Sequence, residues 1–353
     1  MPVYKKDNGT YYASFYYTDW TGKKIKKKKE GFKTKRDAMI YEKEFIIREQ
    51  GTSEMDFKTL VSIYMEDCKA RLKPTTYSTK EFIINYKILP YFSELQIASI
   101  EPTTIRKWQN TLLVHENEYS PTYLKTINNQ VSAIFNYAMK YYKLPSNPAR
   151  ISGSIGKKRA DTMLFWTKEE FRKFINAVED KDMSKIMFEL LFWTGMRSGE
   201  LLALTLDDFK FKDRVVSVNK SYARYKGEDL IQEPKTPKSK RNIIIPEFLC
   251  EEIRKFSERR YDYRSDERLF PMTKFFLHHE MKRGCQNSGV KKIRVHDLRH
   301  SHASLLIEMG FSPLIIAERL GHEDIQTTLQ TYSHLYPNKQ EEVANRLEEL
   351  NRS

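Results

Sequence analysis

The feature that most constrains the fold is a series of amphipathic helical patterns over residues 55–150. In the first pattern, apolar side chains recur at intervals of three and four residues, which places them on one face of a helix. They are Phe57, Leu60, Val61, Tyr64, Met65 and Cys68. A second stripe, which we expect to end at Pro90, consists of Phe82, Ile83, Tyr86 and Leu89. Further stripes follow, so residues 55–150 are expected to form a helical bundle.

The first 52 residues have the pattern of a small sheet followed by one helix. Residues 11–17 are rich in aromatic side chains, as β-strands are, and residues 19–22 have turn chemistry. Residues 23–29 then give a second strand with six lysines. Thr34, with Asp37 three residues later, predicts the start of the helix.

Positive charge suggests what this sheet contacts. The chain has 61 Lys and Arg against 47 Asp and Glu, and a net charge of +14, which attracts polyanions such as nucleic acid. We expect one lysine-covered sheet face to bind the phosphates of double-stranded DNA. Its lysines would be Lys24, Lys26, Lys27, Lys28 and Lys29. The alternative is an edge strand that lysines protect from aggregation.

Residues 165–353 combine many helical patterns with two strands, at 215–218 and 242–245. Gly195 is expected to end one helix and Gly321 another. The helix that opens at residues 295–299 has an apolar stripe of Leu298, His302, Leu305, Leu306 and Met309. A tail helix with Val343, Leu347 and Leu350 is expected beyond Pro337. The chain is therefore predicted to be multidomain and mainly α-helical, with small β-sheets.

The Gly/Ser-rich, basic segment that follows the bundle predicts an interdomain linker at 151–164. The domains would then be 1–52, 55–150 and 165–353. Cys68, Cys250 and Cys285 have no paired spacing, which argues against a zinc site or a disulfide framework. With no long apolar window, we expect a cytoplasmic protein without a membrane partner, associated with the nucleoid if it binds DNA.

Four short motifs in the second half of the chain carry residues suited to phosphodiester chemistry. Residues 194–200 read TGMRSGE, 234–236 read PKT, 296–300 read HDLRH, and 320–322 read LGH, with Tyr332 ten residues after His322. The candidate catalytic residues are Arg197, Lys235, His296, Arg299, His322 and Tyr332.

This set can handle a phosphodiester without a metal, a cofactor or ATP. The planar forks of Arg197 and Arg299 can neutralise the two non-bridging oxygens, and His322 can donate a hydrogen bond to one of them. Tyr332 could attack phosphorus if a base and nearby positive charge activate it. Lys235 could protonate the leaving oxygen, although Lys238, Lys240 and Arg241 are close in sequence.

Other polar residues have plainer interpretations. His278, His279, His300 and His302 could suggest a metal site, but no Asp, Glu or Cys pattern supports one. A histidine such as His302 in an apolar stripe is more often a core residue. Glu200 could orient a catalytic neighbour or form a surface ion pair.

Together these motifs resemble those of the tyrosine recombinases, specifically the integrases of phages and integrative elements. The two arginine boxes at 194–200 and 296–300, the LGH motif and Tyr332 carry the resemblance, which covers essentially the whole chain. It implies that Arg197 and Arg299 bind the scissile phosphate, His296 assists proton transfer, and Tyr332 forms a 3′-phosphotyrosyl intermediate. His322 would bind phosphate and Lys235 would be the acid.

The resemblance also implies a division of labour. Residues 1–52 would bind arm sites, 55–150 would bind the core site, and 165–353 would catalyse and carry a tail that docks on a neighbour in a tetramer. An excision factor and a DNA-bending protein are expected partners. The resulting hypothesis is a site-specific recombinase that integrates and excises a mobile element. The alternatives are a chromosome-dimer resolvase, a type IB topoisomerase-like enzyme, and a non-catalytic DNA-binding regulator.

Overall fold

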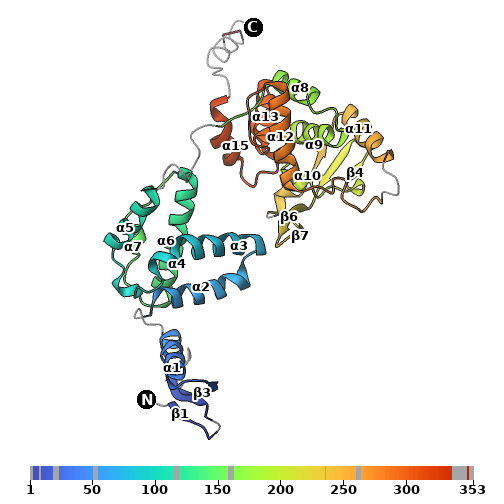
Figure 1. Ribbon diagram of the computed structural model, residues 1–353. Helices are drawn as coiled ribbons and strands as arrows, with labels where there is room; N and C mark the ends of the chain where they lie inside the picture. Colours follow the sequence, from blue (N-terminus) through green and yellow to red (C-terminus); the bar gives the residue numbers. More distant parts are fainter. Residues whose placement is uncertain are drawn as a thin grey trace. The chain divides into compact units, whose positions relative to one another are not determined.

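The computed structural model describes residues 3–7, 9–18, 24–50, 55–114, 119–157, 163–234, 236–259, 264–335 and 348–349 (Figure 1). The chain divides into two compact units, Met1–Asp161 and Thr162–Ser353. Both are mainly helical with small sheets, which confirms the predicted fold class. Among the described residues, no helix is long and apolar enough to cross a membrane.

The first unit begins with a three-stranded antiparallel sheet and one helix. The strands are β1 (Val3–Lys5), β2 (Tyr11–Thr18) and β3 (Lys24–Phe32), in that spatial order, and helix α1 (Lys35–Gln50) follows. Ala13 and Phe15 of β2 pack with Ala38 of α1 to form a small core. The Asp37 amide donates to Thr34 Oγ1 at 3.1 Å, as the sequence predicts for this helix start. Strand β1 was not predicted, because three residues are too few to show a pattern.

A helical bundle forms the rest of the first unit. Its elements are α2 (Phe57–Arg71), α3 (Pro74–Ile83), a π-helical turn η1 (Ile84–Ile88), α4 (Leu89–Phe92), a 3₁₀ turn η2 (Ile97–Ser99), α5 (Pro102–Val114), α6 (Pro121–Tyr141) and α7 (Pro148–Ile151). The bundle core includes all six residues of the first predicted stripe. Asp56 and Ser120 cap α2 and α6 through their side-chain oxygens.

The second predicted stripe is wrong in part. Phe82 and Tyr86 are 53% and 66% exposed, whereas Ile83, Ile84 and Ile88 are buried. Within the π-helical turn, whose winding is wider than that of an α-helix, Ile84 and Ile88 meet the core while Tyr86 is exposed. The prediction that this stripe ends at Pro90 is also wrong, since Pro90 lies in the first turn of α4.

The segment after α7 packs on the bundle as far as the structure describes it. Ile155 is 6% exposed and belongs to the bundle core. The Gly153 carbonyl accepts a 2.8 Å hydrogen bond from Gln109, and the Lys157 amide donates to the Pro121 carbonyl at 3.0 Å. Gly156 has a φ of +76°, and a Cβ there would lie 2.1 Å from the Pro121 oxygen. Residues 152–157 of the predicted linker are thus attached to the first unit.

In the second unit, helices surround one large apolar core. The helices are α8 (Lys168–Asn176), α9 (Asp182–Thr194), α10 (Ser198–Leu201), α11 (Glu247–Glu258), α12 (Lys274–Ser288), α13 (Asp297–Glu308), α14 (Pro313–Leu320) and α15 (Ile325–Tyr332). Short 3₁₀ turns are η3 (Leu206–Asp208), η4 (Pro237–Ser239) and η5 (Ser333–Leu335). Gly195 and Gly321 end α9 and α14 in the left-handed conformation, as predicted. The prediction that Met309 belongs to the apolar stripe of α13 is wrong, since Met309 is 63% exposed.

The small sheet of this unit consists of β4 (Phe209–Lys210), β5 (Val215–Val218) and β8 (Arg241–Ile244) in that order, with antiparallel pairing. The two predicted strands are β5 and β8. Between them lies a hairpin, β6 (Ser221–Tyr225) and β7 (Glu228–Gln232), which the sequence analysis missed. The predicted tail residues Val343, Leu347 and Leu350 lie outside the described residues.

Candidate active site

Tyr332 lies at the end of α15 with its ring inside a small apolar core. The ring packs with Ala303 and Ile307 of α13 and Ile316 and Leu320 of α14, and the residue is only 1% exposed. Its hydroxyl is 2.7 Å from Nδ1 of His300. Burial raises the pKa of Tyr332 to about 12, and the positive charge of Arg299 only partly opposes this effect. The phenol is therefore protonated at neutral pH in this state.

Arg299, near the start of α13, joins three of the four motifs. It is 3% exposed, and its Nη1 and Nη2 donate to the carbonyls of Gly195 and Leu320 at 2.8 and 2.7 Å. Burial and then the charge of Arg197 lower the pKa of Arg299 to about 9, so it remains charged at neutral pH. Gly195 must be glycine here, because a Cβ would lie 2.7 Å from the His302 ring.

Arg197 precedes α10 and pairs with Glu200. Its Nη1 donates to Glu200 at 2.8 Å, and Nη2 of Arg241 donates to the same carboxylate at 2.9 Å. The side chain of Arg197 is 39% exposed, whereas those of Arg241 and Glu200 are 6% and 3% exposed. Burial alone would raise the pKa of Glu200, but Arg241 and Arg197 together lower it. Glu200 therefore joins two arginines in the protein interior, and the surface-pair interpretation is wrong.

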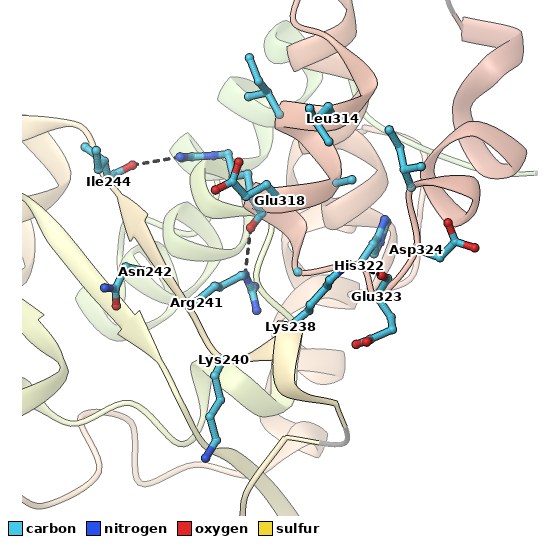
Figure 2. A pocket seen from close by; sticks show the side chains of 15 residues that line it. Lys238, Lys240, Arg241, Asn242, Ile244, Leu314, Glu318, His322, Glu323 and Asp324 are labelled. Atoms are coloured by element: carbon cyan, nitrogen blue, oxygen red, sulfur yellow. Dashed lines mark hydrogen bonds between the residues drawn. The ribbon is translucent and has the colours of Figure 1, made fainter.

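His322 follows Gly321 and lines a cleft of about 960 Å³ between β8, α14 and the start of α15 (Figure 2). Its Nδ1 is 2.7 Å from the hydroxyl of Thr328. Burial, then Arg299, lowers the pKa of His322 to about 3. Nζ of Lys238 donates to the Glu323 carbonyl at 2.8 Å, and Nε of Arg241 donates to the Arg319 carbonyl at 2.9 Å. The segment that leads into β8 thus holds the loop that carries His322.

His296 precedes α13, and its ring meets that of His300 edge to face, with centroids 5.5 Å apart. Burial, then Arg299, lowers the pKa of His296. Lys235 lies outside the described residues. Of its three sequence neighbours, Lys238 binds the Glu323 carbonyl, Lys240 pairs with Glu233 at 3.1 Å, and Arg241 pairs with Glu200. The preference for Lys235 as the acid stays a prediction.

The second unit therefore brings together five of the six candidates. His296 and Arg299 share one motif, Arg197 comes from another, and His322 and Tyr332 come from a third. Electrostatic interactions among these residues shift the pKa values of His296, Arg299, His322 and Tyr332. Sequence reasoning missed His300, which it considered only as a metal ligand. Its position next to Arg299 in the HDLRH motif was the available signal. His302 is a core residue, as predicted, and accepts a 3.0 Å hydrogen bond from Arg319.

The five lysines predicted to form one DNA-binding face of the N-terminal sheet lie on two opposite faces of it. Side chains alternate along β3, and the register pairs Lys26 with Tyr16 and Lys28 with Ser14. Lys24, Lys26 and Lys28 therefore share the open face, where their ammonium groups lie 4.9 to 5.8 Å from the rings of Tyr12 and Tyr16. Lys27 lies over Phe45 of α1, and Lys29 pairs with the buried Ala13.

Comparisons with known proteins identify the family. Three family models match consecutive parts of the chain: an arm DNA-binding domain at 2–48, the N-terminal SAM-like domain of phage integrases at 56–113, and the phage integrase family at 165–339. The ICEBs1 integrase of Bacillus subtilis (strain 168) is 32% identical over 99% of this chain and 100% of that protein.

Solved structures share the fold. The Tn1549 transposon integrase, solved in complex with a circular intermediate DNA, has a TM-score of 0.70 and 21% identity over 84% of this chain and 99% of that chain. A lambda integrase tetramer bound to a Holliday junction has a TM-score of 0.58 and 17% identity over 92% of this chain and 96% of that chain.

Proposed function

This chain belongs to the phage integrase family, and from that premise we propose that it is the integrase of a mobile element. It is a tyrosine-type site-specific recombinase that cuts and rejoins DNA through a 3′-phosphotyrosyl intermediate. The observation that supports this most directly is the position of Arg299. Its guanidinium joins the loops that carry Arg197 and His322 and acts on the pKa of Tyr332.

The cations of the site would bind the scissile phosphate and stabilise the charge that builds up on it. Arg197 is the most exposed of the arginines described above and would meet the phosphate first. Arg299 has five N–H donors, so two backbone carbonyls do not exhaust it. His322 would donate to a non-bridging oxygen. Fixed donors in a buried site stabilise the transition state strongly, because they need no reorganisation when the charge develops.

Tyr332 would attack phosphorus, and the P–O5′ bond would break as the P–Oη bond forms. Lys235 would protonate the departing 5′ oxygen, since an ammonium group is an adequate general acid. The phosphotyrosyl ester retains a reactive phosphorus, so the 5′ hydroxyl of another strand can attack it and restore a continuous backbone. The cycle therefore consumes no nucleotide.

The remaining domains would select the DNA. Residues 1–52 would bind arm sites through the open face with Lys24, Lys26 and Lys28, and residues 55–150 would grip the core site with residues 165–353. We also propose a tetramer on DNA, as in the lambda integrase structure named above. An excision factor and a DNA-bending protein would set direction, and binding would place the protein on the nucleoid.

A nicked core-site duplex tests the proposal. Cleavage beside the nick releases a short fragment with a free 5′ hydroxyl, and its loss by diffusion prevents rejoining, so the covalent adduct accumulates. Wild-type protein should form an adduct that survives denaturing electrophoresis, and Tyr332→Phe should form none, since it lacks the nucleophilic oxygen. Tyr4→Phe removes the same atom from a tyrosine of the N-terminal sheet that is 51% exposed, and it should react normally because the duplex carries no arm site. An adduct that persists in Tyr332→Phe would refute the assignment.

A further inference from the structure

The hydroxyl of Tyr332 makes a 2.7 Å hydrogen bond with Nδ1 of His300, and the two ring planes are inclined at 62°. That distance is typical of a well-formed hydrogen bond from a hydroxyl. Building on the proposed function, we propose that His300 is a further catalytic residue, which takes the phenolic proton as Tyr332 attacks phosphorus.

The contact defines the protonation state that this role needs. A phenol can donate or accept a hydrogen bond, and the role of a base requires that it donate to Nδ1, so we assign the ring hydrogen of His300 to Nε2. Burial and then the neighbouring His296 lower the pKa of His300 to about 4. The imidazole is therefore neutral at pH 7, and its Nδ1 lone pair is available to the phenol.

The surrounding charges make the transfer depend on substrate. Around His300, the positive charges of Arg294 and Arg299 and the ring of His296 disfavour the imidazolium, and Asp297 favours it. With no DNA bound, the phenol keeps its proton. A phosphodiester beside Arg299 would bring a negative charge that offsets part of this repulsion and favours the imidazolium. The nucleophile would then be activated only when the phosphate is in place.

The proton and bond changes balance in both directions. In cleavage, the P–Oη bond forms, the P–O5′ bond breaks, the phenolic proton moves to Nδ1 of His300, and Lys235 protonates O5′. In rejoining, a 5′ hydroxyl loses its proton to Lys235 as its oxygen bonds phosphorus. The P–Oη bond breaks, and the departing phenolate regains its proton from His300.

The geometry also separates two histidines of one motif. His296 lies one helical turn before His300, and the centroids of the two rings are 5.5 Å apart, whereas the hydrogen bond to the nucleophile is made by His300. The resemblance assigns proton transfer to His296. We instead assign the nucleophile's proton to His300, which leaves His296 beside Arg299 to act on the phosphate.

The test measures single-turnover adduct formation on the nicked core-site duplex with the full chain. A positioned base contributes about 100-fold or more, so His300→Ala and His300→Gln should both slow the reaction by at least that factor at pH 7. The glutamine is informative because its carbonyl oxygen can still accept the phenolic hydrogen bond without acting as a base. Raising the pH should partly restore both variants. His278→Gln, at an exposed position on α12, is the matched control.

A substrate with sulfur at the bridging 5′ position separates base from acid, because a thiolate leaves without being protonated. The defect of His300→Gln should be equal on the sulfur and oxygen substrates, whereas that of Lys235→Ala should shrink on sulfur. Full activity of His300→Gln would overturn the proton role, and so would rescue of that variant by sulfur. Faster cleavage by His300→Ala would also overturn it, by showing that His300 restrains Tyr332. If wild-type protein forms no adduct, the proposed function itself fails.

Discussion

The N-terminal sheet and the catalytic centre both gather positive charge, but in opposite surroundings. On the open sheet face, Lys24, Lys26 and Lys28 are exposed to water beside tyrosine rings. In the catalytic centre, Arg299 is 3% exposed and bound to backbone carbonyls. Exposed charges attract any phosphate and are screened by salt, whereas a desolvated charge acts over a short distance on one position. The first arrangement suits capture of DNA, and the second suits chemistry at one phosphate.

The sharpest way to break this comparison is Arg299→Lys, which keeps the charge. A lysine lacks the planar fork that donates to Gly195 and Leu320 at once, so charge alone should not suffice. We expect adduct formation to fall by about 100- to 1000-fold, as for loss of one fixed transition-state donor. Arg259→Lys, at an exposed ion pair with Asp182, should react normally. Equal rates for the two variants would show that the planar fork of Arg299 has no catalytic consequence.

Glu200→Gln tests whether the interior arginines depend on their shared carboxylate. Removing that charge leaves the buried Arg241 without its ionic partner, which costs about 3–5 kcal/mol in other buried pairs. The measurement is urea unfolding of the full chain, followed by tryptophan fluorescence, to which Trp166 and Trp193 of the second unit contribute. Glu233→Gln removes a carboxylate that is 80% exposed and should change stability little. A similar small change in both variants would contradict the distinction between interior and surface charge.

Acid should destabilise the catalytic unit before the N-terminal sheet. Burial lowers the pKa of His302 and His322 to about 3 and of His300 to about 4, whereas histidines in the unfolded chain titrate near 6.5. Between these pKa values the unfolded state binds more protons than the folded state. The free energy of unfolding is therefore highest above about pH 6.5 and falls as the pH drops towards 4.

Thermal unfolding at several pH values measures this effect. Residues 1–52 contain no histidine, so the sheet should show no such loss between pH 6.5 and 5. His302→Gln removes one of the buried titrating groups, and its stability should depend less steeply on pH. An unchanged slope in that variant would argue against burial of neutral His302 as a cause.

The smallest expected effect concerns the sheet lysines. Each phosphate contact contributes about 0.9 to the slope of log affinity against log salt, so changing Lys24, Lys26 and Lys28 to Gln should flatten the slope for arm-site DNA by about two to three units. Lys27→Gln is the control on the helix side, where the ammonium lies 5.1 Å from the Phe45 ring. The measurement is a salt titration of arm-site binding. Equal slopes for the triple variant and the single variant would disprove the proposal that the open face binds the DNA phosphates.

Much of this arrangement follows from local patterns. Gly195 and Gly321 mark helix ends because a left-handed residue after a helix favours glycine, and Asp56 and Ser120 mark helix starts. The six-residue stripe from Phe57 to Cys68 predicted a buried face correctly, since burial there follows helix periodicity.

What the sequence could not show depends on contacts between distant segments. His300 meets Tyr332 across 32 positions, through packing of α13 and α15 that no local pattern encodes. Glu200 has its buried ionic partner because β8 brings Arg241 to it. The β6–β7 hairpin lacks a clear alternation, since Tyr222 is its one residue with a fully buried side chain among those described. The distribution of the β3 lysines over two faces, by contrast, could have been predicted, because successive side chains of a strand point to opposite faces of the sheet.

The π-helical turn at Ile84–Ile88 has a consequence for comparing relatives. A π turn accommodates one more residue than the α-helical turn it replaces. A homologue with one residue fewer at this point could keep the same isoleucine packing by forming an ordinary α-helix. Alignments of such homologues should therefore place a single-residue gap here, inside a helix, rather than in a surface loop.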